Sequence, residues 1–195
     1  MFRSKRRPVV YSQAEHARLA GAIAAAWRPE DVPLPFDSFV RGVTLHDRGY
    51  GELDDDPIGG GMSDERWTEI QTRGFRMRSG DDVTDLVVAL HIRRLIGDEA
   101  EHPLAREIDA ALGDVPEAAR AADRITELCD RVSFAFCFEE PASGAGFTYD
   151  GDETVVLDPW PLAVPELRCV VGGFAADGYP GRLEPVVGLV RLCAS

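Results

Sequence analysis

Three of the four histidines in this chain of 195 residues fall on the apolar faces of predicted helices, and this strongly limits how the chain can fold. Between about Ser12 and Trp27, apolar residues follow His16 at the helical spacings i+3, i+4, i+7 and i+11. The pattern predicts a helix that ends before Pro29, with Ser12 as its N-cap and Glu15 completing a capping box. His16 is therefore expected to face the core.

The other two histidines repeat this arrangement. A second helix is predicted from about residue 36 to His46 and Asp47, and both of these residues continue its apolar stripe. A third helix is predicted over residues 83–96, and it carries His91 on its apolar face. Ionisable side chains from three helices are thus directed toward one interior.

A divalent metal would compensate the burial of these groups. An ionisable side chain on an apolar face is costly to bury unless it is paired. Neutral imidazole and carboxylate are suitable ligands for Mn, Fe, Co or Zn, so one or two such ions could be held by His16, His46 and Asp47. The alternative is that each histidine only forms a hydrogen bond with a neighbour. The adjacent His-Asp pair favours the metal site, whereas His102 precedes Pro103 and is predicted to be a surface or capping residue.

The remaining sequence predicts helices first and strands last. Two further helices are expected at about 103–112 and 116–132, each opened by a proline. Residues 48–82 are predicted to form a long excursion with one helical turn around Trp67. From residues 133–138 onward, short apolar or β-branched runs between turn residues predict strands. The order favours a mainly α, α+β fold: a bundle of about five helices with a small C-terminal antiparallel β region.

The length and the absence of a repeat suit one domain over residues 1–195. Its helical core is expected at about 12–132 and its β-rich part at about 133–195. Residues 8–12 are predicted to be a short strand or an extended lead-in. The late strands could also pair across a homodimer.

The net charge of −13 argues against binding to nucleic acid or to an anionic membrane surface. No apolar run approaches the length of a membrane helix, and the basic N-terminus lacks the apolar region of a secretory signal, so a cytoplasmic location is expected. The four cysteines are not spaced as a metal or redox motif and are expected to be reduced. The expected partner is a small-molecule substrate, and the negative charge does not exclude a phosphorylated one, because a bound divalent metal would be the largest local charge.

Several short motifs resemble a known family. They are Ser-Gln-Ala-Glu-His at 12–16, His-Asp-Arg-Gly-Tyr at 46–50, Leu-His at 90–91, Asp130 with Ser133, and Asp-Pro-Trp-Pro at 158–161. In this order they resemble the bacterial domain of unknown function 3891 family. The order His16, His46-Asp47 and a distant aspartate also resembles the HD superfamily of metal-dependent phosphohydrolases. The resemblance implies an HD-like helical bundle.

The resemblance implies a ligand set of His16, His46, Asp47 and Asp130, with His91 as a ligand of a second metal or as an imidazole that faces the substrate. Asp130, however, lies about 140° from the centre of the apolar face of its helix, at about 100° per residue. Either that helix is buried on two sides, or Asp130 is not a ligand.

The activity implied is metal-dependent hydrolysis of a small phosphoester or nucleotide. Asp47 and His91 are expected to be the catalytic residues, and four others are expected to contact the substrate: Gln13, Tyr50, Arg73 and Arg76. An HD-type di-iron oxygenase is the weaker enzymatic alternative, because it needs about six ligands. A metal-stabilised binding or regulatory domain without activity is the third possibility.

Overall fold

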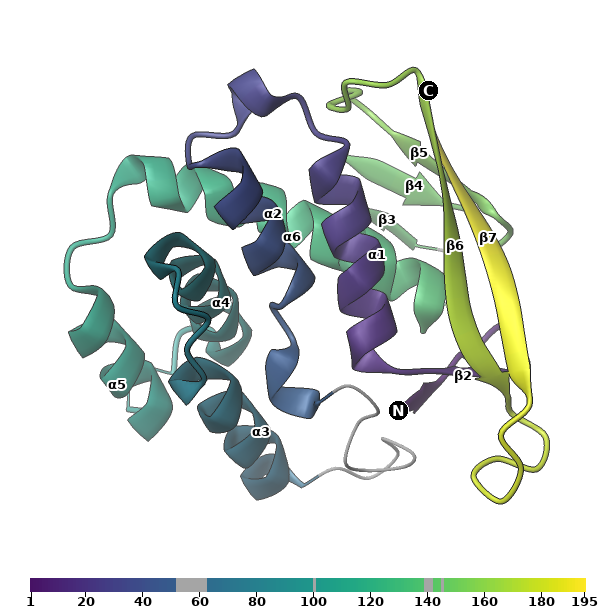
Figure 1. Ribbon diagram of the computed structural model, residues 1–195, viewed down its shortest axis with the longest axis horizontal. Coiled ribbons are helices and arrows are strands. Elements are labelled where there is room, and N and C mark those ends of the chain that lie inside the picture. The colour runs from purple at the N-terminus through teal and green to yellow at the C-terminus, as the bar shows by residue number, and fades with distance from the viewer. Residues whose placement is uncertain (52–62, 100, 139–141, 145) are drawn as a thin grey trace.

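The fold was analysed in a computed structural model that describes residues 1–51, 63–99, 101–138, 142–144 and 146–195. Helices and a sheet form two sides of the molecule, with α1 lying between them (Figure 1). The helices are α1 (Gln13–Ala25), α2 (Phe36–Thr44), α3 (Asp64–Arg76), α4 (Asp82–Ile96), α5 (Pro103–Leu112) and α6 (Glu117–Cys137). In the described part of the chain, no helix is both long enough and apolar enough to cross a membrane.

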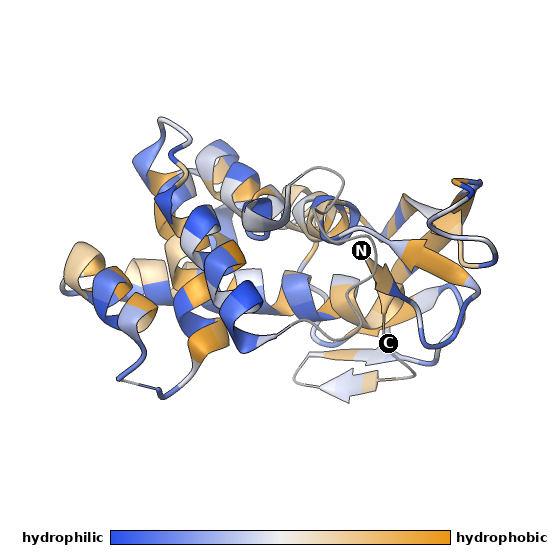
Figure 2. Ribbon diagram, turned by 90° about the horizontal axis from the view of Figure 1, so that it is seen from below, coloured by the Kyte–Doolittle hydropathy of each residue, from blue (hydrophilic) through white to orange (hydrophobic). Residues whose placement is uncertain are grey.

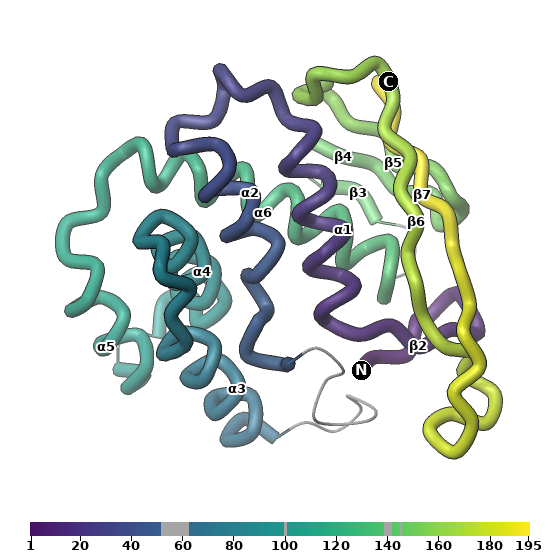
Figure 3. The backbone as a smooth tube through the Cα atoms, in the orientation of Figure 1, coloured from purple at the N-terminus to yellow at the C-terminus, as the bar shows by residue number. Residues whose placement is uncertain are grey.

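The seven strands form one mixed sheet with the order β1-β2-β6-β7-β5-β4-β3. Their bounds are β1 (Phe2–Arg3), β2 (Val9–Tyr11), β3 (Ala142–Gly144), β4 (Phe147–Tyr149), β5 (Thr154–Leu157), β6 (Glu166–Ala175) and β7 (Pro185–Ala194). Only β5 and β7 are parallel neighbours. Segments from the N-terminal and C-terminal parts of the chain are neighbours in this sheet, because β2 pairs with β6 through Val9 and Val10 (Figure 3).

The expectation of a helical bundle with a small C-terminal antiparallel β region is therefore wrong. The sheet is mixed, has seven strands, and includes strands from the N-terminus, so the molecule is a helix-and-sheet fold. The segment 133–138 extends α6 instead of forming a strand, and the excursion predicted at 48–82 contains the 13-residue helix α3. The predicted strand at 133–138 fails because its apolar residues lie between the helices and the sheet, where a helix can be buried on more than one side.

Helix α1 is the central element. It contacts α2 and α6 on the helical side and β6 on the other side. Its predicted N-cap is present, since the Ser12 hydroxyl accepts a hydrogen bond from the Glu15 backbone N–H. The Glu15 side chain instead accepts from the backbone N–H of Gly172, and Arg18 donates to the Val170 carbonyl. Strand β2 pairs only with the last two residues of β6, and these bonds from α1 satisfy backbone groups along the part of β6 that β2 does not reach.

Two main apolar clusters hold the elements in place, and Figure 2 shows apolar and polar residues mixed along the helices. The larger cluster fills the space between the helices and the sheet, with Leu19, Phe136 and Leu192 fully buried. The smaller one joins α3, α4 and α5 through residues such as Val88 and Ile108. Because α1, α2, α4 and α6 are all anchored in these clusters, side chains at their facing positions are held rigidly.

Candidate metal centre

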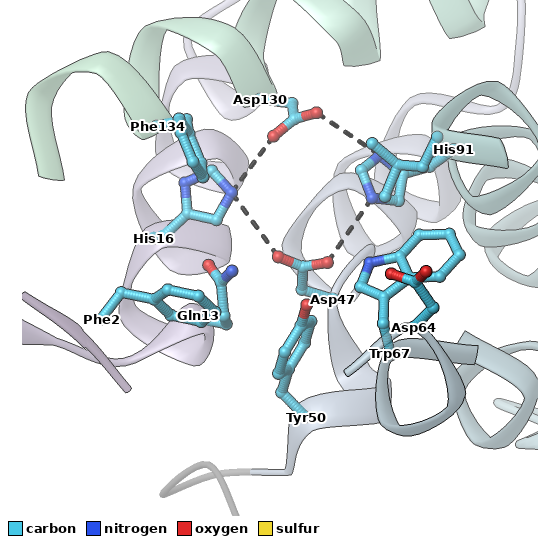
Figure 4. Close-up of a pocket in the computed structure, with 11 residues that line it drawn as sticks. Phe2, Gln13, His16, Asp47, Tyr50, Asp64, Trp67, His91, Asp130 and Phe134 are labelled. Atoms are coloured by element: carbon cyan, nitrogen blue, oxygen red, sulfur yellow. Dashed lines mark ion pairs between the residues drawn. The ribbon is translucent and has the colours of Figure 1, made fainter. Parts of the chain in front are cut away.

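Four structural elements bring five ionisable side chains to one point (Figure 4). His16 comes from α1, His46 and Asp47 follow the end of α2, His91 comes from α4, and Asp130 comes from α6. All five are buried, with exposed fractions between 1% and 8%. The structure thus brings together every residue for which metal binding was predicted.

Helix α6 explains how Asp130 reaches this point from outside its predicted apolar face. The second half of the helix is buried on two sides, since Cys129, Asp130, Val132 and Ser133 are consecutive or nearly consecutive and all buried. Of the two alternatives left open by the sequence, the structure has the helix with two buried sides.

The turn that carries His46 and Asp47 is fixed by close packing against α3. A 3₁₀ turn, Arg48–Tyr50, follows the pair directly. A Cβ atom on Gly49 would lie 2.2 Å from the Ile70 carbonyl oxygen, so only glycine fits there. Arg48 is held by Asp85 at 2.8 Å, and both side chains are more than nine-tenths buried. The glycine of the His-Asp-x-Gly motif therefore has a packing role next to the cluster.

Hydrogen bonds define which nitrogen of two histidines carries the proton. The Nδ1 atom of His46 lies 2.6 Å from the Val43 carbonyl oxygen, which can only accept, so Nδ1 carries the hydrogen. The Ser133 hydroxyl donates to the Asp130 carbonyl oxygen at 2.9 Å and accepts from His16 Nδ1 at 2.8 Å. In neutral rings, both Nε2 atoms therefore hold lone pairs, and they face each other at 3.2 Å.

Two carboxylate oxygens complete a group of four acceptors. Asp130 Oδ1 lies 3.2 Å from His16 Nε2 and 3.6 Å from His46 Nε2. Asp47 Oδ2 lies 3.6 Å and 3.7 Å from the same two nitrogens. A cation with four tetrahedral bonds of about 2.0–2.1 Å separates its ligand atoms by about 3.3–3.4 Å. These separations around the two Nε2 atoms, and the nitrogen and oxygen donors themselves, therefore suit a divalent metal.

The pKa shifts within the cluster also indicate that its two carboxylates favour a positive charge between them. Burial lowers the pKa of His46, but the Asp47 and Asp130 carboxylates outweigh it and raise this pKa to about 9. Burial would raise the pKa of Asp47, yet His46 and His91 hold it below its usual range. Burial would likewise raise the pKa of Asp130, which His16 and His46 keep well below the usual range. Without a metal, the carboxylates thus keep a proton on the cluster.

His91 differs from the other two histidines because an arginine faces it. Arg94 donates to His91 Nδ1 at 3.2 Å, and a guanidinium can only donate, so His91 Nε2 carries the hydrogen in a neutral ring. Nε2 lies 3.5 Å from Asp47 Oδ1 and has no hydrogen-bond partner in the described part of the chain. Burial and the neighbouring charge of His46 lower the pKa of His91, which favours this neutral form.

A second group, His46, His91 and Asp130, also offers three ligand atoms within 4.8 Å of one another. The hydrogen bond from Arg94 competes with any bond between His91 Nδ1 and a metal. Arg94 itself is paired with Asp130 and with Asp123, both at 3.5 Å. Arg94 was not predicted as a site residue, although its position three residues after His91 places it on the same side of α4.

A pocket of about 340 Å³ opens directly onto the cluster. His16, Asp47, His91 and Asp130 form its floor (Figure 4). Its other described lining residues are mostly aromatic or apolar: Phe2, Gln13, Tyr50, Asp64, Trp67, Leu95 and Phe134. A small molecule in this pocket would contact the cluster.

Of the four residues predicted to contact a substrate, the structure places two in this pocket. Gln13 and Tyr50 line it. Arg73 instead donates to the Gly49 carbonyl oxygen, and Arg76 pairs with Glu107 on the surface. The arginine-rich end of α3 is thus used to hold the turn and to join two helices, and neither arginine is among the described residues of the pocket wall.

Asp64, Trp67 and Phe134 line the pocket but were not predicted as site residues. Asp64 and Trp67 lie three residues apart on α3, a helix that the sequence analysis reduced to one turn. Phe134 lies one turn beyond Asp130 on the part of α6 that was predicted as a strand. The i+3 and i+4 spacings were the available signals, but they apply only once these segments are known to be helical.

Comparison with known proteins adds one finding. A family model described as protein of unknown function (DUF3891) matches residues 2–59, a segment that contains Gln13, His16, His46, Asp47 and Tyr50. No curated protein and no solved structure matched the chain. The match supports the predicted resemblance to this family, whereas the resemblance to the HD superfamily stays a prediction.

Proposed function

We propose that this chain, which resembles the DUF3891 family over its N-terminal segment, is a metal-dependent hydrolase of a small phosphoester. One observation carries the proposal. The Nε2 atoms of His16 and His46 lie 3.2 Å apart, and each lies 3.2 to 3.7 Å from one oxygen of Asp47 and one oxygen of Asp130, directly below an open pocket. His16, His46, Asp47 and Asp130 would hold one divalent ion of the Mn, Fe, Co or Zn type.

The pocket favours catalysis over a purely structural metal. A structural site encloses its ion, whereas a catalytic site leaves one position open. Here three of the four side chains, those of His16, Asp47 and Asp130, line the base of a pocket of about 340 Å³, so a substrate could reach a bound ion. A bound ion with an open position would supply a water nucleophile near neutral pH and polarise a phosphoryl oxygen.

The surrounding residues support distinct roles. Ser133 and the Val43 carbonyl direct the lone pairs of His16 and His46 inward. Arg94 orients His91 so that its Nε2–H lies on the side of Asp47 at the floor of the pocket, where it can donate a hydrogen bond to Asp47 or to a leaving oxygen. Asp47 balances the charge of the ion and lies 3.5 Å from the same Nε2–H.

Hydrolysis is better supported than oxygen chemistry. A di-iron oxygenase would need about six ligands, and the described cluster offers five side chains, one of which is bound by Arg94. The fourth histidine, His102, does not join them, because its Nδ1 accepts from the Leu104 N–H and caps α5.

The first test is metal analysis of protein purified without chelator. We expect about one equivalent of a divalent transition metal in the wild type, a loss in His46→Ala, and no loss in the matched control His102→Ala. Protein loaded with Mn, Co or Zn should hydrolyse p-nitrophenyl phosphate or its bis-ester, and His46→Ala should not. Bound metal without hydrolysis of either ester would contradict the enzymatic proposal, and equal metal in His46→Ala would contradict the site. Oxygen consumption by iron-loaded protein would favour the oxygenase instead.

A further inference from the structure

The walls of the pocket above the cluster are aromatic. Phe2 and Tyr50 lie on one side, with ring centroids 6.1 Å apart, and Trp67 lies on the other (Figure 4). Phe134 stands beside His16, with ring centroids 5.7 Å apart. These rings lie next to polar, ionisable groups. Apolar rings that line an open pocket beside polar groups are typical of a ligand-binding site.

Outside the cluster, the charged side chain among the described lining residues of the pocket is acidic. Asp64 lines the pocket next to Trp67, and its carboxylate is drawn in front of the indole ring in Figure 4. Among the described residues that line the pocket, none is lysine or arginine.

The nearby arginines are already paired within the protein. Arg48 is held by Asp85, Arg73 donates to the Gly49 carbonyl oxygen, and Arg94 is bound by two aspartates. A bound divalent ion would be neutralised by the carboxylates of Asp47 and Asp130. A substrate with several phosphates would therefore bring negative charges that no described group of the pocket could meet.

The same walls suit a positive group. The face of an aromatic ring is negative, so it attracts a cation that lies over it. The volume of about 340 Å³ is at the lower end for ligand pockets, so the ligand is small. The net charge of −13 attracts cations and opposes polyanions at long range.

We propose that the pocket recognises a compact organic cation, an alkylammonium group, on the alcohol part of the phosphoester. The inference rests on the proposed hydrolase function for the phosphoester part only. The ammonium group would lie between Trp67 and Tyr50 near Asp64, with the phosphate at the cluster. The substrate class is then an amino-alcohol phosphoester, and nucleotides are excluded.

Binding of the cation can be tested without metal or catalysis. Isothermal titration of chelator-treated protein with choline should show binding, and the uncharged isostere 3,3-dimethylbutanol should bind about tenfold more weakly. Asp64→Asn and Trp67→Leu should each weaken choline binding about three- to tenfold. Glu69→Gln, an exposed carboxylate on the same helix but outside the pocket, should leave it unchanged.

Hydrolysis separates the two proposals. Metal-loaded protein should cleave phosphocholine with a kcat/KM about tenfold above that for 3,3-dimethylbutyl phosphate, and Asp64→Asn should remove this preference. Equal or better cleavage of the uncharged ester or of phenyl phosphate would overturn the cation site while hydrolysis stands. Choline binding that depends on Asp64, with no ester cleaved, would support the cation site and overturn the hydrolase. No choline binding to a folded wild-type protein would overturn the cation site.

Discussion

Replacement of Ser133 by alanine tests how the protein prepares His16 for a metal. Its hydroxyl is fully buried and has two partners: it accepts from His16 Nδ1 at 2.8 Å and donates to the Asp130 carbonyl oxygen at 2.9 Å. The first bond keeps the hydrogen on Nδ1 and the lone pair on Nε2. In Ser133→Ala the Nδ1–H has no acceptor, so the hydrogen can move to Nε2 and block the position of the metal.

Two effects should follow, and their sizes can be worked out. A buried N–H without an acceptor costs about 1–3 kcal/mol, so metal-free Ser133→Ala should lose about that much free energy of unfolding. Loss of a group that orients a metal-binding histidine typically weakens metal affinity by about 10–100-fold. This corresponds to about 1.4–2.7 kcal/mol of binding free energy.

Urea unfolding with a chelator present measures the first effect, and competition with a fluorescent zinc chelator measures the second. Thr126→Val is the matched control, because Thr126 is equally buried on α6 and its hydroxyl donates only to the Ala122 carbonyl oxygen at 3.0 Å. The control should keep wild-type affinity. A Ser133→Ala affinity within about twofold of the wild type would refute the orienting role.

Three further predictions concern the cluster and the packing and ion pair that hold its helices and turn in place. The pKa of His46, raised from 6.5 to about 9, gives the metal-free fold a stabilising contribution that is complete below pH 6.5 and is lost as pH rises through 9, so urea unfolding should show a falling free energy of unfolding between these values. Calorimetry in buffers of different ionisation enthalpy should show about one proton released per metal bound at pH 7.5. Gly42→Ala should cost about 1–3 kcal/mol in urea unfolding, because its Cβ would lie 2.6 Å from the Val87 Cβ between α2 and α4. Asp85→Asn should cost about 1–3 kcal/mol and reduce metal affinity, since it releases Arg48 from the turn after Asp47.

Each of these has a control or an opposing result. Metal binding without proton release would show that His46 is not protonated in the free protein. Gly181→Ala, whose Cβ would meet its nearest atom at 3.4 Å, should be tolerated, and a similar loss there would remove the packing explanation. Asp109→Asn breaks a more exposed pair with Arg93 and should leave metal affinity intact. Unchanged affinity in Asp85→Asn would show that the turn holds without this pair.

Local periodicity was sufficient to predict the helices that carry the cluster. The apolar stripes that contain His16 and His91 correspond to α1 and α4, and the stripe that precedes His46 corresponds to α2, which ends at Thr44. The capping box at Ser12 was half right. Ser12 caps α1, but the Glu15 side chain accepts a hydrogen bond from the backbone N–H of Gly172 in β6. The two residues are 157 positions apart, so no local pattern contains this contact.

Local patterns predicted several strands but not how they pair in the sheet. The short strand expected at residues 8–12 is present as β2, whereas residues 2–3 gave no signal of a strand. Both take their place in the sheet by pairing with each other and, for β2, with Phe174 and Ala175 near the other end of the chain. Helix α3 was missed because few apolar residues mark it, and its contacts with the turn at Gly49 replace a broad apolar face. The two-sided burial of α6 likewise depends on its position between α4 and the sheet.

The central claim is that two imidazoles and two carboxylates hold one divalent ion at the base of the pocket. Anomalous diffraction at the Zn or Co absorption edge, from crystals grown with that metal, tests it most directly. We expect one strong anomalous peak within about 2.0–2.3 Å of His16 Nε2, His46 Nε2 and one oxygen each of Asp47 and Asp130. An anomalous map in which these side chains are ordered but no peak lies between them, or in which the metal is bound only elsewhere, would contradict the claim.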